Sequence, residues 1–373
     1  MGIIIAGIDQ VEEYFESECV NQSSLKNLEN GFGGYMAALA KKRKDKEENK
    51  PTPEYFLIGG AVDLILTGDP GEFEEEYYVS TLEKKPSEVE INIINSVFHE
   101  LNDNNLLHEV EWDACDNAIL AAADEFEWQM RWKAETRITK LKLAGEAYFE
   151  DLKNSVGMKI LTSAQKNTID SIVMSLTSNP KTKKYFDRTM QAEQKNMDFY
   201  YQLPIYFMYE GVECKALLDL VVVHKDNDGK IIKIEPIDLK TMSGDTLQFV
   251  SKMRHHRYDI QAAWYTQALL THFNVLADKI EPFKFIVEST TMVGKPLVFV
   301  ITAATLHHGK FGTPGGVFNS EGGERKLYYP QVKGYKQLMD DYLYYEEQGW
   351  KQDAIVDANP DIITMDYSRG ITL

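Results

Sequence analysis

The pattern of hydrophobic positions changes at about residue 199. Upstream, apolar residues recur at helical spacing or in short buried runs, which predicts helices at 54–68, 117–153 and 163–178. Ser163 is a suitable N-cap for the last of these helices, and Asn179-Pro180 ends it. Downstream, aromatic and β-branched residues predict strands. We expect strands at 200–209, 212–224, 230–240, 283–290 and 297–303, helices at 245–273 and 330–349, and a Gly-rich loop at 309–323.

Tight turns link the first three expected strands. Glu210-Gly211 and Asp226-Asn227-Asp228-Gly229 are sequences that close hairpins, so these strands are predicted to form an antiparallel meander. The expected fold class is α/β of the α+β kind, with a central mixed sheet that contains the meander, flanking helices and a helical N-terminal elaboration. The expected parts are 1–198, 199–305 and 306–373, packed as one compact domain.

The composition is that of a globular chain. Of its 373 residues, 43% are hydrophobic and 26% are charged, which excludes a disordered or fibrous protein. No apolar run approaches the roughly 20 residues that span a bilayer, so no membrane association is expected. Cys19, Cys115 and Cys214 are far apart, which predicts neither a disulfide framework nor an iron–sulfur cluster. A cytoplasmic location is therefore expected.

The formal net charge of −18 is concentrated in one segment. Residues 71–127 contain 16 acidic side chains and two basic ones, Lys84 and Lys85, and so carry −14 of the total. This acidic segment is either a solvated face or a surface that binds a partner or repels DNA. The next window, 128–198, is basic, with 13 basic and 8 acidic residues.

Three charged side chains on adjacent strands form a candidate catalytic group. Asp219 lies inside an apolar strand, where a carboxylate is costly to bury unless it is paired or binds a metal. Asp238 and Lys240, two residues apart on the next strand, point to the same face. Two carboxylates, with the backbone carbonyl of Leu239, suit Mg²⁺, and Lys240 would orient a water or stabilise developing charge. The alternative is a buried Asp–Lys ion pair between strands.

The helix expected after these strands carries further candidate residues. Gln261 and Tyr265 are spaced i and i+4 and so share one face. Arg254 and Arg257 precede them on nearly the same stripe. This set is suited to contact a phosphate backbone and Lys240, although an ordinary polar helix face is the alternative.

These residues resemble the PD-(D/E)XK nuclease superfamily, in the branch with a Gln-x-x-x-Tyr motif. More narrowly, the chain is similar to the phage exodeoxyribonuclease VIII (RecE-like) exonucleases over roughly residues 20–305. The resemblance rests on motif order and spacing: Asn21 to Lys26 (NQSSLK), Ile58 to Leu66 followed by Pro70 and Phe73, Val212 to Ala216, Asp219, Pro236 to Thr241, and Gln261 to Tyr265.

The chain also departs from the family pattern. Asp63 stands where the family commonly has His, and Leu217 stands where it often has Arg. The cysteine cluster of the iron–sulfur branches is missing. Asp is also a hard metal ligand, so the resemblance implies a metal site of Asp63, Asp219, Asp238 and Leu239 for Mg²⁺ or Mn²⁺, although Asp63 as a helix-surface carboxylate remains the alternative.

The resemblance implies an ATP-independent 5′→3′ exonuclease. Such an enzyme resects linear duplex DNA from its ends and leaves 3′ single strands for phage-type recombination. A single-strand annealing protein, a ring-shaped homo-oligomer and the cytoplasm of a bacterial host are implied with it. A structure-selective or nicking endonuclease and a catalytically inactive DNA-end or protein-binding module are the alternatives.

The basic window is expected to face the DNA. Lys181, Lys183, Lys184 and Arg188 are candidates for phosphate contacts, with a solvated surface as the alternative. Residues 128–198 together with Arg254 and Arg257 are expected to lie along the DNA path, and the acidic segment away from it.

Overall fold

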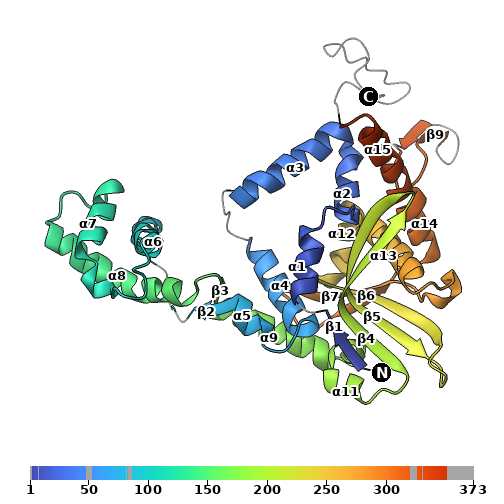
Figure 1. Ribbon diagram of the computed structural model, residues 1–373, viewed down its shortest axis with the longest axis horizontal. Helices are drawn as coiled ribbons and strands as arrows, with labels where there is room; N and C mark the ends of the chain where they lie inside the picture. Colours follow the sequence, from blue (N-terminus) through green and yellow to red (C-terminus); the bar gives the residue numbers. More distant parts are fainter. Residues whose placement is uncertain are drawn as a thin grey trace, which may run out of the picture. The chain divides into compact units, whose positions relative to one another are not determined.

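The chain folds into two compact units in a computed structural model (Figure 1). The sheet unit comprises Met1–Pro53, Leu66–Asp69 and Ile172–Leu373, and the helical unit comprises Glu54–Ile65 and Pro70–Ser171. The structure describes residues 2–6, 8–47, 53–80, 82, 86–319, 326–329 and 331–350. Lys84 and Lys85 lie outside the described residues.

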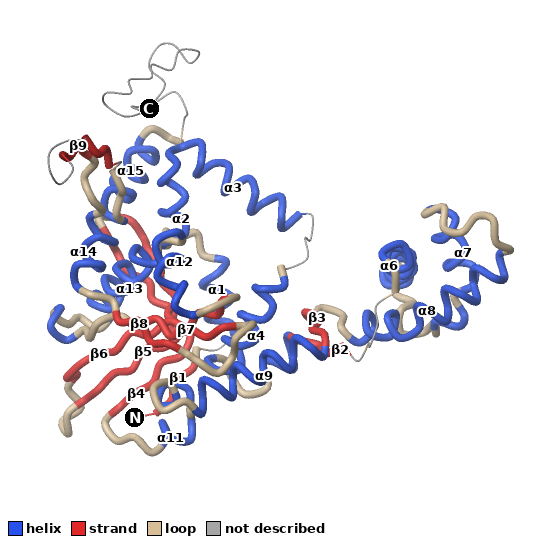
Figure 2. Tube along the Cα trace, turned by 180° about the vertical axis from the view of Figure 1, so that it is seen from behind, coloured by secondary structure: helices blue, strands red, loops and turns tan. Residues whose placement is uncertain are grey.

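The sheet unit is built on a six-stranded mixed sheet with the order β1-β4-β5-β6-β7-β8. Helices flank the sheet, which confirms the expected mixed α/β architecture (Figure 2). The pairs β1–β4 and β6–β7 are parallel and the other neighbours are antiparallel. The strands are β1 (Gly2–Ile5), β4 (Met197–Tyr209), β5 (Val212–Lys225), β6 (Ile231–Met242), β7 (Lys284–Ser289) and β8 (Leu297–Val300).

The predicted antiparallel meander is confirmed as β4-β5-β6. Asp226 and Gly229 close the second hairpin, where the N–H of Gly229 donates to the carbonyl of Asp226 and Gly229 has φ of +83°. A residue without a Cβ adopts this backbone conformation at little cost, which is why Gly occurs at this turn. Pairing between β5 and β6 extends to Leu220 and Ile237.

Helices cover the sheet and complete its core. The longer ones are α1 (Ile8–Glu16), α3 (Gly31–Glu47), α13 (Tyr258–His272), α14 (Ala303–Phe311) and α15 (Tyr335–Glu347). The shorter ones are α2 (Gln22–Asn27), η1 (Leu28–Asn30), α10 (Lys183–Phe186), α11 (Arg188–Ala192), η3 (Thr246–Gln248), α12 (Phe249–His255) and η4 (Ala277–Lys279). The strands β9 (Gly316–Asn319) and β10 (Lys326–Tyr329) form a separate hairpin.

Two sequence expectations in this unit were wrong. The helix expected at 245–273 is divided into η3, α12 and α13, because Arg257 adopts φ of +53°, a left-handed conformation that ends one helix before the next begins. The Gly-rich segment 309–323 is not one loop, since its start belongs to α14 and residues 316–319 form β9. The remainder, 320–323, lies outside the described residues.

A buried acidic residue, Glu235, is neutralised inside the sheet unit. Its carboxylate lies 3.1 Å from Lys284 Nζ, 3.3 Å from Lys233 Nζ and 2.7 Å from His224 Nε2. Burial alone would raise the pKa of Glu235, but the neighbouring ammonium groups outweigh this effect and lower the pKa to about 2. The negative charge of Glu235 is therefore balanced by the cations around it, and its role is structural.

The helical unit has a hydrophobic core of its own. The helices α6 (Glu88–Asp103), α7 (Asp116–Glu125) and α8 (Ala134–Asn154) pack around buried Ile93, Leu141 and Phe149. Trp112 stacks on Phe149, with ring centroids 4.8 Å apart. The remaining elements are α4 (Glu54–Thr67), α5 (Glu72–Glu76), the parallel pair β2 (Tyr77–Ser80) and β3 (Lys159–Thr162), η2 (Trp112–Ala114) and α9 (Ser163–Ser178), and the unit bounds fall within α4 and α9.

The helices expected at 54–68 and 163–178 are confirmed by α4 and α9. The single helix expected at 117–153 was wrong, because the loop 126–133 separates α7 from α8. Glu127 and Gln129 adopt φ of +49° and +48° in this loop, which a continuous helix does not allow. Across the described residues, none of the helices combines the length and apolar character needed to cross a membrane.

The contact between α13 and α14 depends on a glycine, which gives a test of the fold. A Cβ at Gly309 would overlap the carbonyl of Asp259 and lie 3.0 Å from Ala263 Cβ. We expect Gly309→Ala to lower the free energy of unfolding by about 2–3 kcal/mol, because backbone cannot yield as a flexible side chain does. Urea unfolding followed by circular dichroism measures this change.

Gly33→Ala is the matched control. Gly33 lies inside α3 with nothing within 4 Å of its added Cβ, so alanine there should be neutral or stabilising by up to about 1 kcal/mol. Equal effects of the two substitutions would show that the α13–α14 packing is looser than described.

Candidate functional site

The candidate site lies where strands β5 and β6 separate. Their backbone pairing reaches Leu220 and Ile237, and the next residues toward the site are Asp219 and Asp238. From Ile237 onward β6 pairs with β7. The N–H of Leu239 donates to Asp219 Oδ2 at 2.8 Å, so a side chain replaces a backbone acceptor at this point. The two carboxylates of the sequence prediction therefore occupy the fork between the strands.

Asp238 is buried against two side chains. Only 1% of the residue is exposed; Oδ1 accepts a 2.7 Å hydrogen bond from Gln261 Nε2, and Oδ2 forms an ion pair with Lys240. Oδ2 makes no regular hydrogen bond within the described part of the chain. Burial raises the pKa of Asp238, and Lys240, Lys26 and Gln261 offset only part of that rise.

Lys240 is the cationic member of the site. It points to the same face as Asp238, as the i, i+2 spacing predicts, and its side chain remains 23% exposed. Burial would lower the pKa of Lys240, but the carboxylates of Asp238 and Asp219 outweigh burial and raise it. Its ammonium also lies 5.4 Å from the ring centroid of Tyr258. Lys240 is therefore held as a charged group with access to solvent.

Helix α13 supplies Gln261 and Tyr265 from one face. The helix is anchored by Trp264, which is fully buried and donates its indole N–H to the carbonyl of Lys215 at 3.1 Å. Gln261 and Tyr265 are both buried. Burial raises the pKa of the Tyr265 phenol well above its ordinary value, and Asp238, Tyr14 and Asp219 add to this shift. The structure thus brings five predicted residues together: Asp219, Asp238, Lys240, Gln261 and Tyr265.

Lys26 is a site residue that the sequence prediction did not include. It belongs to α2, which begins with a capping box between Asn21 and Ser24. Its ammonium donates to the carbonyl of His256 at 3.1 Å. Burial lowers the pKa of Lys26 to about 8, and Lys240 contributes to the shift by repulsion. Lys26 ends the Asn21 to Lys26 motif of the sequence analysis, and this position was the signal that could have identified a second cation.

Arg257 belongs to a buried ion network, and its contact with DNA stays a prediction. Its guanidinium pairs with Glu29, lies 3.0 Å from Asp259 Oδ1 and donates to the carbonyl of Lys333 at 2.8 Å. His308 Nδ1 lies 2.7 Å from Asp259 Oδ2. Only 11% of the Arg257 side chain is exposed, so its donors are occupied by the protein itself.

Arg254 and Arg257 do not share a helical stripe. Arg254 is exposed in the last turn of α12, whereas Arg257 stands at the left-handed break before α13. The prediction of one shared stripe assumed a continuous helix at 245–273. Because the helix breaks at Arg257, the two arginines do not share a helical face. A phosphate contact by Arg254 stays a prediction.

The four basic residues after α9 that were predicted to contact phosphate differ in their exposure to solvent. Lys181, Lys183 and Lys184 are exposed, and their phosphate contacts stay a prediction. Arg188 donates to the carbonyl of Gly68 and lies 5.1 Å from the ring centroid of Tyr201, so it serves the packing of the sheet unit. Asp63 is a half-buried residue of α4 in the helical unit, and its role as a ligand stays a prediction.

The donor set of the fork suits a hard cation. Asp219, Asp238 and the carbonyl of Leu239 offer only oxygen atoms, and Mg²⁺ is commonly held by one or two carboxylates and several waters. Asp238 Oδ2, buried with no regular hydrogen bond, is an oxygen that a cation could engage. Within the described residues, no group of three or more His, Cys, Asp or Glu side chains is arranged to hold a metal.

The buried network makes a testable distinction between the two arginines. Arg257→Met should lower the free energy of unfolding by about 3 kcal/mol, because it leaves Glu29 and Asp259 without their cation. Arg254→Met should stay within about 0.5 kcal/mol of the wild type. Urea unfolding followed by circular dichroism compares them. An unchanged stability of Arg257→Met would mean that its ion pairs do not hold the junction between α12 and α13.

Comparison with known proteins does not assign the chain to a family. No protein-family model matches it, and no curated protein matches its sequence. Among solved structures, it matches a candidate exonuclease from Eubacterium rectale at 14% sequence identity and a TM-score of 0.29. The match covers 59% of this chain and 77% of that protein. A likeness of this strength shows neither the family nor the function of the chain.

Proposed function

We propose that the chain is a metal-dependent deoxyribonuclease with a PD-(D/E)XK core. The observation that carries the proposal is the fork between β5 and β6, where Asp219, Asp238 and Lys240 meet and Gln261 binds the Asp238 carboxylate. An ordinary structural ion pair needs only the Asp and the Lys. A second carboxylate and a raised pKa for Asp238 are features of a site that is built to bind a cation or transfer charge.

Asp219, Asp238 and the carbonyl of Leu239 would hold Mg²⁺, with Mn²⁺ as a substitute. When bound, the ion would neutralise charge on the scissile phosphate and make a water molecule more acidic. The proposed reaction is hydrolysis: the water oxygen bonds to phosphorus and gives up one proton to solvent, and the bond from phosphorus to the leaving sugar oxygen breaks. The leaving oxygen keeps the bonding electron pair and takes a proton from solvent to become a hydroxyl. An in-line arrangement of the two oxygens is expected for phosphoryl transfer.

The side chains of the site have separable roles in this reaction. Lys240, whose pKa is raised, stays positively charged and donates to phosphoryl oxygens as negative charge develops. Gln261 fixes the orientation of Asp238 through its amide. Tyr265 is a neutral phenol at ordinary pH, and burial, which raises its pKa, keeps it neutral in alkaline solution as well. Tyr265 therefore adds no negative charge that would repel the phosphate.

The finer function is carried by the sequence resemblance. We propose ATP-independent 5′→3′ resection of linear duplex ends, with Asp63 as a further ligand, a single-strand annealing protein as partner and a ring-shaped homo-oligomer as the working form. The phosphate contacts would come from Arg254, Lys181, Lys183 and Lys184. A nicking endonuclease and an inactive binding module on the same core are the alternatives, and the activity on linear and circular DNA separates them from an exonuclease.

A time course on end-labelled linear duplex DNA tests the activity, its polarity and its metal requirement. We expect nucleotide release with Mg²⁺ or Mn²⁺, none with EDTA, and a loss of about a hundredfold or more in Asp238→Asn. Asp228→Asn, which changes an exposed carboxylate in the hairpin turn, is the matched control and should keep full activity.

Closed circular DNA separates the alternatives. Rapid loss of circles would establish an endonuclease. Equal inactivity of the wild type and Asp238→Asn with every metal would establish a binding module.

Lys26 gives a second test, because its cation faces the same site as Lys240. We expect Lys26→Met to raise KM for DNA about tenfold or more through loss of a charge-assisted contact to phosphate. Since the pKa of Lys26 is about 8, its charge is lost as pH rises through that value. KM of the wild type should therefore rise above about pH 8.

Two variants control this test. Lys26→Arg keeps its charge at high pH and should flatten the rise in KM. Lys252→Met removes a neighbouring cation of α12 and should leave KM within about twofold. A KM that is unchanged in Lys26→Met would exclude Lys26 from substrate binding.

A further inference from the structure

The ammonium of Lys240 lies over two aromatic rings as well as beside a carboxylate. Its Nζ is 5.4 Å from the ring centroid of Tyr258 and 5.9 Å from that of Phe285. Both distances are within the roughly 6 Å over which the face of a ring attracts a cation. In the register of β6 and β7, Phe285 lies opposite Asp238, so Phe285 and Lys240 are diagonal neighbours on one face of the sheet. Lys240 therefore has aromatic partners in addition to its ion pair with Asp238.

The two rings belong to a packed aromatic cluster. Phe249 stacks on Tyr258, with ring centroids 5.6 Å apart and planes at 17°, and it lies 5.5 Å from Phe285. The rings of Tyr258 and Phe285 are 5.6 Å apart. The three residues come from α12, α13 and β7, and only 1% of Phe249 and 0% of Phe285 is exposed. The packing of this cluster therefore fixes where the ring of Tyr258 lies.

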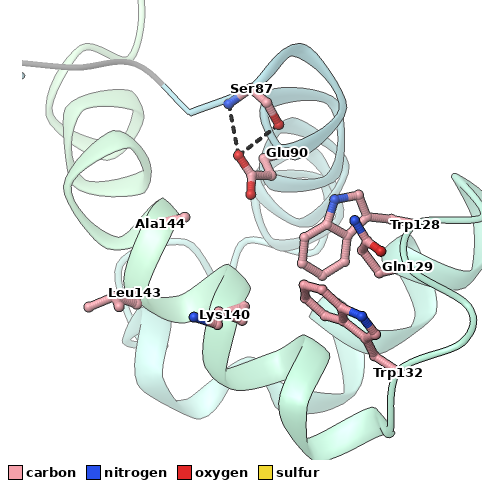
Figure 3. Close-up of a pocket in the computed structure, with 8 residues that line it drawn as sticks. All are labelled: Ser87, Glu90, Trp128, Gln129, Trp132, Lys140, Leu143 and Ala144. Atoms are coloured by element: carbon pink, nitrogen blue, oxygen red, sulfur yellow. Dashed lines mark hydrogen bonds between the residues drawn. The ribbon is translucent and has the colours of Figure 1, made fainter.

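A lysine near aromatic side chains does not by itself make such a contact. In the helical unit, Trp128 and Trp132 line a groove together with Lys140 (Figure 3). The two indole rings meet edge to face, with centroids 5.7 Å apart, and Figure 3 shows the ammonium of Lys140 turned away from both. The placement of Lys240 over two rings is therefore a particular feature of the candidate site.

A metal ion held by Asp238 would compete with Lys240 for the same carboxylate. Lys240 pairs with Oδ2 of Asp238, an oxygen that the proposed Mg²⁺ would engage. Two cations beside one oxygen repel each other, so metal binding would weaken this ion pair. Asp219, whose charge also acts on Lys240, is a proposed metal ligand as well. The π faces of Tyr258 and Phe285 offer no lone pair to a hard cation, so they stay available to the ammonium.

We propose that Tyr258 is a positioning residue of the candidate site, whose ring holds Lys240 in place when a metal ion occupies Asp238. The inference rests on the proposed function, in which Lys240 donates to phosphoryl oxygens as negative charge develops. Because Tyr258 acts through Lys240, loss of its ring should slow the chemical step and leave DNA binding nearly unchanged. The attraction depends on the ring and not on the hydroxyl.

The kinetics of nucleotide release from linear duplex DNA separate this role from a structural one. Tyr258→Leu removes the ring and should lower kcat about tenfold at saturating Mg²⁺, with KM within about twofold of the wild type. Tyr258→Phe keeps the ring and should restore kcat to within about threefold of the wild type. A loss of kcat that Tyr258→Phe does not rescue would overturn the proposal.

Tyr200→Leu is the matched control. Tyr200 is a similarly half-buried tyrosine of β4, and its ring contacts Phe273 at a centroid distance of 5.9 Å. The variant should keep kcat within about twofold of the wild type. Circular dichroism checks that each variant is folded. Equal losses of kcat in Tyr200→Leu and Tyr258→Leu would show a general effect of aromatic packing and would overturn the proposal.

Nuclear magnetic resonance of the full chain with isotope-labelled lysine gives a readout that needs no activity. The ring of Tyr258 should shift the ε protons of Lys240 upfield, and the signal is identified by its loss in Lys240→Arg. We expect the shift to persist when Mg²⁺ is added, and Tyr258→Leu to move the signal toward that of an exposed lysine. A Lys240 signal that is the same in the wild type and Tyr258→Leu would overturn the proposal, even in an active enzyme. A Tyr258-dependent shift in a wild type that releases no nucleotides with any metal ion would support the contact and overturn the proposed function alone.

Discussion

The buried carboxylate of Asp238 is the group on which the arrangement of the sheet unit depends. A carboxylate that is 1% exposed must be compensated, and here the compensation comes from Lys240 two residues along the strand and from Gln261 on α13. Strand β6 carries a second buried acid, Glu235, whose pKa is lowered to about 2 by surrounding cations. The pKa of Asp238 is raised. The cations around Glu235 fully compensate its negative charge. The charge of Asp238 is only partly compensated, and its Oδ2 has no regular hydrogen bond among the described residues.

The fork between β5 and β6 explains why the partly compensated carboxylate of Asp238 lies beside a second carboxylate, that of Asp219. Where backbone pairing between the strands ends, the side chain of Asp219 accepts a hydrogen bond from the N–H of Leu239, and Gln261 of α13 donates one to Asp238. Helix α13 can approach because Trp264 anchors it to β5 and Gly309 lets α14 pack closely behind it. The site is thus a consequence of strand divergence combined with close helix packing.

The sequence predicted the parts of this arrangement that depend on local spacing. The meander, the shared face of Asp238 and Lys240, and the shared face of Gln261 and Tyr265 all follow from the periods of strands and helices. The two helix predictions that were wrong, at 245–273 and 117–153, failed because of backbone conformations that non-glycine residues seldom adopt. Arg257 divides one expected helix, Glu127 and Gln129 divide another, and neither change has a strong sequence signal. Lys26 was missed because its place near Lys240 depends on tertiary packing: its ammonium donates to the carbonyl of His256, 230 positions away in the sequence.

The separate cores of the two units have a spectroscopic consequence. Of the five tryptophans, Trp112, Trp128 and Trp132 belong to the helical unit, whereas Trp264 and Trp350 belong to the sheet unit. A chain with two hydrophobic cores need not unfold in one step, so a probe within each core is needed to assign an unfolding midpoint to its unit. Intrinsic fluorescence therefore reports mainly on the helical unit. Trp264, fully buried on α13, is the natural reporter for the core beside the carboxylates.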